Sequence, residues 1–276
     1  MSFTYSQQQL AIFDAIASGK SPVLKIKATA GASKTSSLTE AVARYKRIEP
    51  NAKVLYLVFG NLASKEARAE FSTNAIVSTL HAYAFSKVVK QYGLGEVKNF
   101  LTWQDIPKTV RRPFGKDAEI ISIIDDYCKS KFITMDSYVD SIEQDDFQFS
   151  LIPAVKQILN LMATGAMPIT HAFYLKLYHI LVMREKEFPP EVDRLLIDEA
   201  QDLNNAQYQL LKSICGNENK NIMMVGDPNQ SIFAFNGSNS DFMTKNFVND
   251  YQAKTIELKE NYRSSRQVLE AAEKIM

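Results

Sequence analysis

A strand that ends in two carboxylates is the feature that most constrains the fold of this chain. The apolar residues 195–197 lead directly into Asp198 and Glu199. Open α/β sheets bind their ligands at the carboxyl ends of the strands. The pattern therefore favours a sheet with an acidic pair at its binding edge, where the metal of a nucleotide would lie. Acidic residues also commonly do no more than close a strand, so the neighbouring motifs decide between the two interpretations.

A loop of small residues follows the first expected strand. Residues 23–28 are rich in strand-forming side chains, and a helical pattern continues after residue 34. The loop between them resembles a phosphate-binding P-loop, in which backbone N–H groups surround a phosphate while a Lys and a Ser or Thr reach phosphate and magnesium. Lys34 and Thr35 fit those two roles. The usual pattern has Gly at both ends, where this chain has Ala28 and Ser33. A simple helix-capping loop is the alternative.

Strand-like and helical segments alternate over much of the chain. This alternation predicts an α/β fold with a parallel sheet flanked by helices. The further strand-like segments are residues 53–59, 76–81, 193–198, 221–225 and 254–258.

Residues 93–166 have a different character, because helical segments separated by Pro, Gly and acidic loops replace the strands. This pattern predicts a helical insert. Residues 85–135 carry nine Lys or Arg against six acids, whereas residues 136–150 carry five acids and no base. Such an asymmetry marks either a face that binds nucleic acid or an ordinary solvated helix surface.

Overall charge and cysteine content limit the classes of protein to which the chain can belong. The formal net charge is +1, so a polyanion would have to bind through a local patch. Cys128 and Cys215 lie far apart without a metal-type spacing, which suggests a reducing compartment. No apolar run has the length of a membrane span. We expect a soluble intracellular protein of the cytoplasm, nucleoid or nucleus.

Four ordered motifs together resemble those of a known family. Residues 28–35, 198–202, 226–230 and 261–264 resemble the P-loop, the Asp-Glu-x-Gln-Asp box, the third motif and the Asn-Tyr-Arg-Ser motif of UvrD/Rep-type superfamily 1 DNA helicases. The resemblance implies a P-loop NTPase with a RecA-like parallel sheet, flanked by helices, and an all-helical inserted subdomain. The implied divisions are a first RecA-like part at 1–92, the insert at 93–166, a second RecA-like part at 167–259, and the start of a second RecA-like domain, missing from this chain, at 260–276.

The resemblance also assigns roles in binding and hydrolysing ATP. Lys34 would hold the β- and γ-phosphates, Thr35 and Asp198 would hold Mg²⁺, and Glu199 would position and deprotonate the attacking water. Gln230 would sense the γ-phosphate, and Arg263 would stabilise its developing charge. Gln7, or alternatively Gln8, would read the adenine, and Tyr262 would stack on it. The other expected nucleotide-binding residues are Ala30, Gly31, Ala32, Ser33 and Ser36.

A further set of residues matches the segments that contact single-stranded DNA in the family: Phe59, Asn61, Thr79, His81, Phe233, Phe235 and Asn236. Phe235 stands where a base-stacking Trp is usual, and Asn236 stands where an Arg is usual. Taken alone, His81 would more often be a structural histidine. Core packing is the ordinary role of a Phe such as Phe233 or Phe235.

The expected function is therefore that of an ATP-dependent DNA helicase motor domain that uses ATP and Mg²⁺ and binds single-stranded DNA. A non-translocating module that binds nucleotide and DNA, as a switch or to recruit a partner, is the alternative. A kinase or small-molecule ATPase fits less well, because the acidic box and the Asn-Tyr-Arg-Ser motif would have no role.

Overall fold

The chain is described by a computed structural model that covers residues 4–17, 23–29, 31–110, 116–142, 146–186, 191–215, 221–232 and 237–261. These residues fall into two compact units. The sheet unit comprises Met1–Thr79, Glu191–Leu203 and Cys215–Met276, and the helical unit comprises Leu80–Pro190 and Asn204–Ile214.

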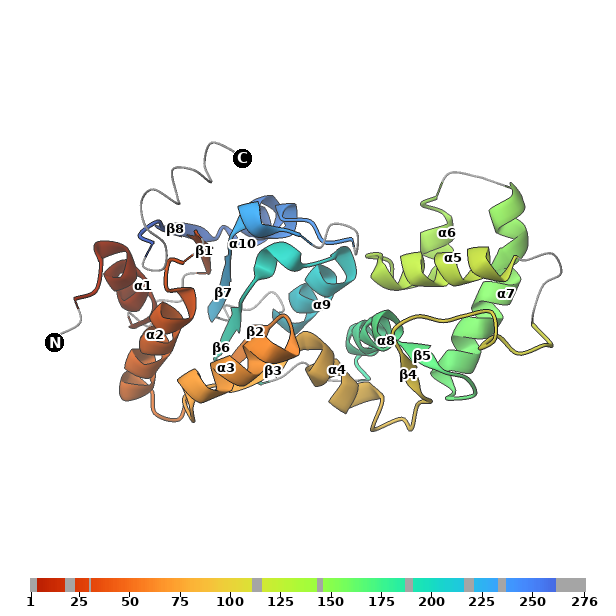
Figure 1. Ribbon diagram of the computed structural model, residues 1–276, viewed down its shortest axis with the longest axis horizontal. Coiled ribbons are helices and arrows are strands. Elements are labelled where there is room, and N and C mark those ends of the chain that lie inside the picture. Colours follow the sequence, from red (N-terminus) through yellow and green to blue (C-terminus); the bar gives the residue numbers. More distant parts are fainter. Residues whose placement is uncertain are drawn as a thin grey trace. The chain divides into compact units, whose positions relative to one another are not determined.

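The described part of the sheet unit contains a six-stranded parallel sheet with the strand order β3-β2-β6-β7-β1-β8 (Figure 1). All the strands run in one direction, so their carboxyl ends meet at one edge. Every residue of β2 and β6 is buried, as expected for central strands covered on both faces. The α/β parallel sheet predicted from the sequence is confirmed. The strands are β1 Leu24–Ala28, β2 Val54–Val58, β3 Ile76–Thr79, β6 Arg194–Ile197, β7 Asn221–Gly226 and β8 Lys254–Leu258.

Helices α1 Gln7–Ala17, α2 Lys34–Ile48 and α3 Asn61–Phe71 belong to the sheet unit, and α1 packs on α2, which packs on α3. Their apolar faces share one core with β1 and β2. Helix α1 begins at a reciprocal capping box: the Ser6 Oγ accepts from the Gln9 N–H, and the Gln9 Oε1 accepts from the Ser6 N–H. The unit also contains the short elements η1 Ala200–Asp202, η2 Pro228–Gln230, η4 Phe242–Asn246 and α10 Phe247–Tyr251.

The helical unit is built around α8 His171–Met183, which packs on α4 Leu80–Val88 and on α5 Asp117–Lys129. Helix α5 also packs on α7 Asp146–Ala163. The remaining helices are α6 Met135–Val139 and α9 Asn205–Cys215, the latter assigned to this unit as far as Ile214.

The expectation of an all-helical insert needs a correction. Strand β4 Val97–Lys98 pairs in parallel with β5 Ile169–Thr170 in the helical unit. Strands of two residues are too short to show an alternating pattern, so the sequence gives no sign of them.

The limits of the helical unit also differ from those inferred for the insert. The unit begins at Leu80 and extends to Pro190, whereas the sequence pattern placed the insert at 93–166. Contacts between α4 and α8 account for the difference: the ring centroids of Phe85 and Tyr174 lie 5.9 Å apart, and those of Tyr83 and Tyr178 lie 6.0 Å apart. The sequence boundary followed the loss of strand character, which does not reveal how flanking helices pack.

Most of the expected start of a second RecA-like domain, from residue 262 onward, lies outside the described residues. Among the helices in the described stretches, none combines the length and the apolar character needed to cross a membrane.

Candidate functional site

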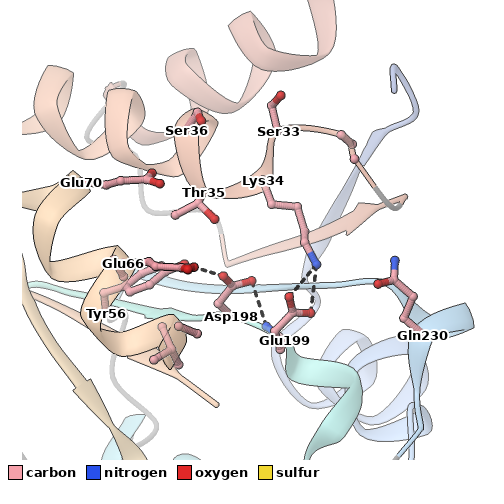
Figure 2. Close-up of a pocket in the computed structure, with 15 residues that line it drawn as sticks. Ser33, Lys34, Thr35, Ser36, Tyr56, Glu66, Glu70, Asp198, Glu199 and Gln230 are labelled. Atoms are coloured by element: carbon pink, nitrogen blue, oxygen red, sulfur yellow. Dashed lines mark hydrogen bonds and ion pairs between the residues drawn. The ribbon is translucent and has the colours of Figure 1, made fainter. Parts of the chain in front are cut away.

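A pocket of about 550 Å³ lies at the carboxyl edge of the sheet, and all the residues that line it belong to the sheet unit (Figure 2). It gathers side chains from the β1–α2 loop, β2, α3, the end of β6 and η2. Its lining residues are Gly31, Ala32, Ser33, Lys34, Thr35, Ser36, Tyr56, Val58, Ala63, Glu66, Ala67, Glu70, Asp198, Glu199 and Gln230.

The β1–α2 loop turns through two left-handed residues. Gly31 has a φ of 73°, and Ser33, which precedes the first residue of α2, has φ 52° and ψ 43°. Such a conformation is free for Gly but strained for Ser because of its Cβ. Helix α2 begins at Lys34, and the first N–H groups of a helix have no partner within the helix. The loop therefore presents backbone donors and the positive end of a helix dipole to the pocket, an arrangement suited to an anion such as phosphate.

Lys34 is paired with a carboxylate across the pocket. Its Nζ donates to both carboxylate oxygens of Glu199, at 3.0 and 2.9 Å. The Lys34 side chain is 13% exposed and that of Glu199 is 33% exposed, so the pair lies partly open to solvent. The Lys34 ammonium group can exchange its carboxylate partner for another anion that enters the pocket, and Glu199 would then be unpaired.

Asp198 is held by two hydrogen bonds at the end of β6. Its Oδ2 accepts from the Tyr56 hydroxyl at 2.5 Å, and its Oδ1 accepts from the Glu199 N–H at 2.9 Å (Figure 2). Burial raises the pKa of Asp198, and the nearby Glu199 charge raises it further, while Lys34 acts in the opposite direction. The same burial, together with Asp198, raises the pKa of Tyr56, which keeps that phenol a donor.

The oxygen donors at this place suit a magnesium ion. Thr35 and Asp198 both line the pocket. Mg²⁺ is usually bound by one or two carboxylates together with substrate phosphates and waters, not by a complete cage of protein ligands. The described residues contain no group of three or more His, Cys, Asp or Glu that could hold a metal ion alone.

Gln201 joins the ends of β6 and β7. Its Nε2 donates to the Glu199 Oε2 at 2.9 Å, and its Oε1 accepts from the Asp227 N–H at 3.1 Å. Gly226 permits this approach, since a Cβ there would lie 2.3 Å from the Gln201 Oε1. Beyond it, the Gln230 Nε2 donates to the Asp227 Oδ2 at 2.5 Å.

Glu199 itself has a left-handed backbone, with φ 48° and ψ 40°, and strain of this kind is concentrated at functional sites.

The sequence did not single out several residues of this site. Tyr56 lies within the apolar strand β2, and only the pairing of β2 with β6 places it beside Asp198. Glu66 and Glu70 line the pocket from α3, where their spacing of four residues puts them on one helix face. Gln201 lies inside the acidic motif at residues 198–202, so the sequence marked its position, but it predicted no contact for its side chain.

The three consecutive glutamines on the first turn of α1 have different surroundings. Gln7, the expected adenine reader, is exposed and is not among the pocket residues. The Gln8 Oε1 accepts from the Lys259 N–H at 2.8 Å, just beyond β8. Gln9 is buried and donates to Ser37 on α2 at 2.9 Å.

The expected DNA-contacting residues are divided between the two units. Phe59 follows β2, Asn61 begins α3, and Thr79 ends β3, which pairs with β2 through Val58, so these residues share one edge of the sheet. Of these, Asn61 is exposed, Phe59 is half-buried and Thr79 is buried.

His81 belongs to the helical unit. Its Nδ1 lies 3.2 Å from the Tyr174 hydroxyl, which also lies 3.0 Å from the His171 Nδ1. Burial, and secondarily the nearby His171, lowers the pKa of His81 to about 4. The remaining expected site residues lie outside the described part of the chain: Ala30, Phe233, Phe235, Asn236, Tyr262 and Arg263.

Comparison with known proteins gives consistent matches. Residues 175–252 match the family model of the UvrD/REP helicase N-terminal domain. Over its whole length the chain is 27% identical to the ATP-dependent DNA helicase Rep of Buchnera aphidicola and covers 45% of that protein. It is 26% identical to F-box DNA helicase protein 1 of Schizosaccharomyces pombe, over 81% of the chain and 27% of that protein. Over 37% of the chain it is 38% identical to DNA helicase II of Escherichia coli, of which it covers 14%.

Among solved structures, the Pif1 helicase from Candida albicans matches 99% of this chain and 44% of its own, with a TM-score of 0.49 and 15% identity. The chain thus spans less than half the length of these relatives. The family model and several curated helicases therefore agree that this chain is similar to UvrD/Rep-type helicases.

Proposed function

We propose that this chain is the ATP-binding motor part of an ATP-dependent DNA helicase, which binds ATP with Mg²⁺ in the pocket at the sheet edge and binds single-stranded DNA at the strand ends. The observation that carries the proposal is the Lys34–Glu199 pair beside the β1–α2 loop and the buried Asp198. The names of the relatives, which are helicases and in several cases ATP-dependent, support it.

In this proposal the Lys34 Nζ exchanges Glu199 for the β- and γ-phosphates, while backbone donors at the start of α2 surround the phosphate. Thr35 and Asp198 hold Mg²⁺, which when bound neutralises charge on the phosphates. Glu199, released from Lys34, accepts the proton of the attacking water. Gln230, anchored to Asp227, senses the γ-phosphate. Gln7 or Gln8, Tyr262 and Arg263 keep the adenine and transition-state roles that the resemblance gives them.

DNA binding is proposed for the same edge of the sheet. Phe59, Asn61 and Thr79 lie at neighbouring strand ends, and the resemblance adds His81 and the segment 233–236. Stacking of a base on an aromatic ring is worth roughly 1–3 kcal/mol by alanine substitution. We therefore expect Phe235→Ala to weaken single-stranded DNA binding by about tenfold or more, measured by fluorescence anisotropy. Unchanged affinity would assign Phe235 to core packing.

The second candidate is a non-translocating module that binds nucleotide and DNA. It is favoured by the strained Ser33 in the phosphate loop, because such a loop is a less standard catalytic site. Turnover of ATP with and without single-stranded DNA separates the two candidates. A motor hydrolyses ATP faster when DNA is bound, whereas a binding module shows no DNA-dependent turnover.

The pocket assignment is tested by titrating the chain with ATP and Mg²⁺ in a calorimeter. Lys34→Ala should lose most of the affinity, because its ammonium group is the side-chain cation assigned to the β- and γ-phosphates of bound ATP. Lys254→Ala is the matched control, since Lys254 is exposed on β8 and does not line the pocket. If Lys34→Ala bound ATP as tightly as the parent chain, the phosphate assignment would be wrong.

A further inference from the structure

Tyr56 carries a hydroxyl in the middle of the otherwise apolar strand β2. The residue is fully buried, and its ring packs on Phe71 of α3 with the two ring centroids 4.4 Å apart. A buried Tyr hydroxyl usually has a hydrogen-bond partner, because an unsatisfied one costs free energy. Packing fixes the ring, so the partner of the hydroxyl shows what this side chain does besides filling the core.

The register between β2 and β6 directs this hydroxyl to Asp198. Tyr56 pairs with Leu196, and the side chain two residues further along, that of Asp198, lies on the same face of the sheet. The Asp198 N–H donates to the Leu57 carbonyl at 2.9 Å, which fixes the backbone that carries the carboxylate. The Tyr56 hydroxyl donates to the Asp198 Oδ2 at 2.5 Å (Figure 2). Two neighbouring central strands therefore hold both partners of this hydrogen bond.

Neutral donors hold the Asp198 carboxylate. Within the described stretches of the chain, Lys34 pairs with Glu199, and Asp198 forms no ion pair, although it is only 6% exposed. An ionised carboxylate has about four acceptor positions. The Tyr56 hydroxyl occupies one on Oδ2, and the Glu199 N–H occupies one on Oδ1. The other positions are available to a metal ion, and the two donors determine the direction in which those positions point.

We propose that Tyr56 is a positioning residue for the Mg²⁺ site, and that its hydroxyl holds the Asp198 carboxylate in the orientation that meets the metal. The proposal rests on the proposed function, because it takes Asp198 as a ligand of the Mg²⁺ bound with ATP. Tyr56 touches neither the metal nor the phosphates in this account. Groups that form hydrogen bonds to a metal ligand fix its orientation, and their loss typically costs about 10- to 100-fold in metal affinity or activity.

The substitution Tyr56→Phe separates this role from core packing. It removes the hydroxyl and keeps the ring that packs on Phe71. The Asp198 carboxylate then keeps its hydrogen bond from the Glu199 N–H, but it is free to rotate away from the orientation that meets the metal. Replacement of Tyr56 by p-aminophenylalanine keeps a weaker donor at the same place, and it also serves if Tyr56→Phe does not fold.

A control variant removes a buried Tyr hydroxyl elsewhere in the chain. The Tyr127 hydroxyl donates to the Ile133 carbonyl at 2.9 Å in the helical unit, and Tyr127 does not line the pocket. Tyr127→Phe therefore matches the chemical change without touching the site. Asp198→Asn, alone and combined with Tyr56→Phe, completes a double-mutant cycle that measures the coupling of the two residues.

The experiment titrates Mg²⁺ into each variant at a fixed concentration of a fluorescent ATP analogue, and separately measures binding of the analogue in excess EDTA. We expect Tyr56→Phe to raise the Mg²⁺ concentration at half-maximal binding by about 10- to 100-fold. Binding in EDTA should change little, because Lys34 and the backbone donors of the loop are intact. The p-aminophenylalanine variant should fall between the two, and Tyr127→Phe should match the parent. In the Asp198→Asn background, Tyr56→Phe should weaken Mg²⁺-dependent binding no further.

The inference is overturned if Tyr56→Phe needs no more Mg²⁺ than the parent, or if binding in EDTA weakens as much as binding in Mg²⁺, which is the result that a purely structural role predicts. Parent binding that is independent of Mg²⁺ would overturn it together with the assignment of Asp198 to the metal. A parent chain that binds no nucleotide would instead overturn the proposed function. Mg²⁺ alone then tests the inference: at constant ionic strength it should raise the urea midpoint of the parent more than that of Tyr56→Phe. Equal or absent increases would leave Tyr56 as a core residue.

Discussion

Lys34 in the sheet unit and Lys176 in the helical unit are both withdrawn from solvent, but their partners give them different roles. Lys34 pairs with the carboxylate of Glu199 in an open pocket. Lys176 is 1% exposed and donates to the carbonyls of Ser130 and Phe132, at 2.7 and 2.9 Å, just beyond α5. A carboxylate in a pocket can be exchanged for a phosphate, whereas backbone carbonyls in a core cannot. The partner, more than the burial, separates a binding lysine from a structural one.

The surroundings of the two lysines extend this difference. Around Lys34, carboxylates and amides connect the ends of several strands at one edge. Near Lys176, the Nδ1 of His179 is buried and finds no hydrogen-bond partner among the described residues, and burial raises the pKa of the Cys128 thiol to about 12. Burial also lowers the pKa of Lys176 to about 8. In the sheet unit, ionisable and amide side chains gather at an open edge of the sheet. In the helical unit, ionisable side chains are buried inside the fold.

The largest effect that tests this difference is expected for Glu199→Gln. The amide still accepts a hydrogen bond from Lys34, but it cannot take a proton from water. A positioned general base typically contributes about 10²- to 10⁴-fold, so phosphate release at saturating ATP should fall by that amount. ATP affinity, measured in the same buffer, should change little. Full turnover by Glu199→Gln would show that the pocket lacks the proposed base.

A matched pair of substitutions compares the two lysines directly. Lys176→Met leaves the partly buried carbonyls of Ser130 and Phe132 without this donor, and each costs up to about 1–3 kcal/mol, partly offset because a buried charge is removed. We therefore expect a loss of about 2–4 kcal/mol in the free energy of urea unfolding, with little change in ATP affinity. Lys34→Met should show the reverse.

The outcome that would break the comparison is a loss of ATP affinity in Lys176→Met that persists at temperatures well below its unfolding transition. Such a result would mean that the helical unit contributes to nucleotide binding through more than the stability of its own fold.

The pH dependence of stability should also distinguish the units. Burial, followed by the charge of Lys176, lowers the pKa of His179 from 6.5 to about 4. The unfolded chain therefore binds a proton between pH 6.5 and pH 4 that the folded chain does not. Stability falls as the pH decreases through this range, by roughly 3 kcal/mol at most, since each pKa unit is worth about 1.4 kcal/mol.

His81 adds the same trend, while Asp202, whose pKa is raised to about 6, opposes it because its folded form retains a proton longer. The difference between the parent and His179→Leu isolates one residue. Urea unfolding at pH 7 and pH 4.5 should show a smaller acid-induced loss in His179→Leu. Identical losses would mean that His179 is protonated without penalty in the fold.

The sequence predicted the parts of the site that depend on local patterns. Each expected strand exists, and Lys34, Thr35, Asp198, Glu199 and Gln230 line one pocket, because parallel strands bring their carboxyl ends to the same edge. Their chemical roles stay predictions. Contacts between residues that are distant in sequence could not be predicted. Tyr56 reaches Asp198 only through strand pairing, and Gln9 reaches Ser37 only through the packing of α1 on α2. Such contacts leave no periodic signal in the chain.

The smallest expected effect compares one hydrogen bond at a buried and an exposed site in the helical unit. Thr170 accepts from the Phe173 N–H at the start of α8, and Thr134 accepts from the Ser137 N–H at the start of α6. Both are N-caps, but Thr170 is 8% exposed while Thr134 is exposed. Loss of an N-cap costs about 0.5–2 kcal/mol. Because water can replace the lost oxygen only at the exposed site, Thr170→Ala should lie near the upper end and Thr134→Ala near the lower end.

Urea unfolding of the two variants measures this difference, and ATP affinity should stay unchanged in both. Burial then acts on a neutral hydroxyl as it acts on Lys176: it makes each fixed hydrogen bond expensive to remove. If Thr134→Ala proved as damaging as Thr170→Ala, solvent access would not decide the value of polar contacts in the helical unit. The contrast between Lys34 and Lys176 would then have to rest on the chemistry of their partners alone.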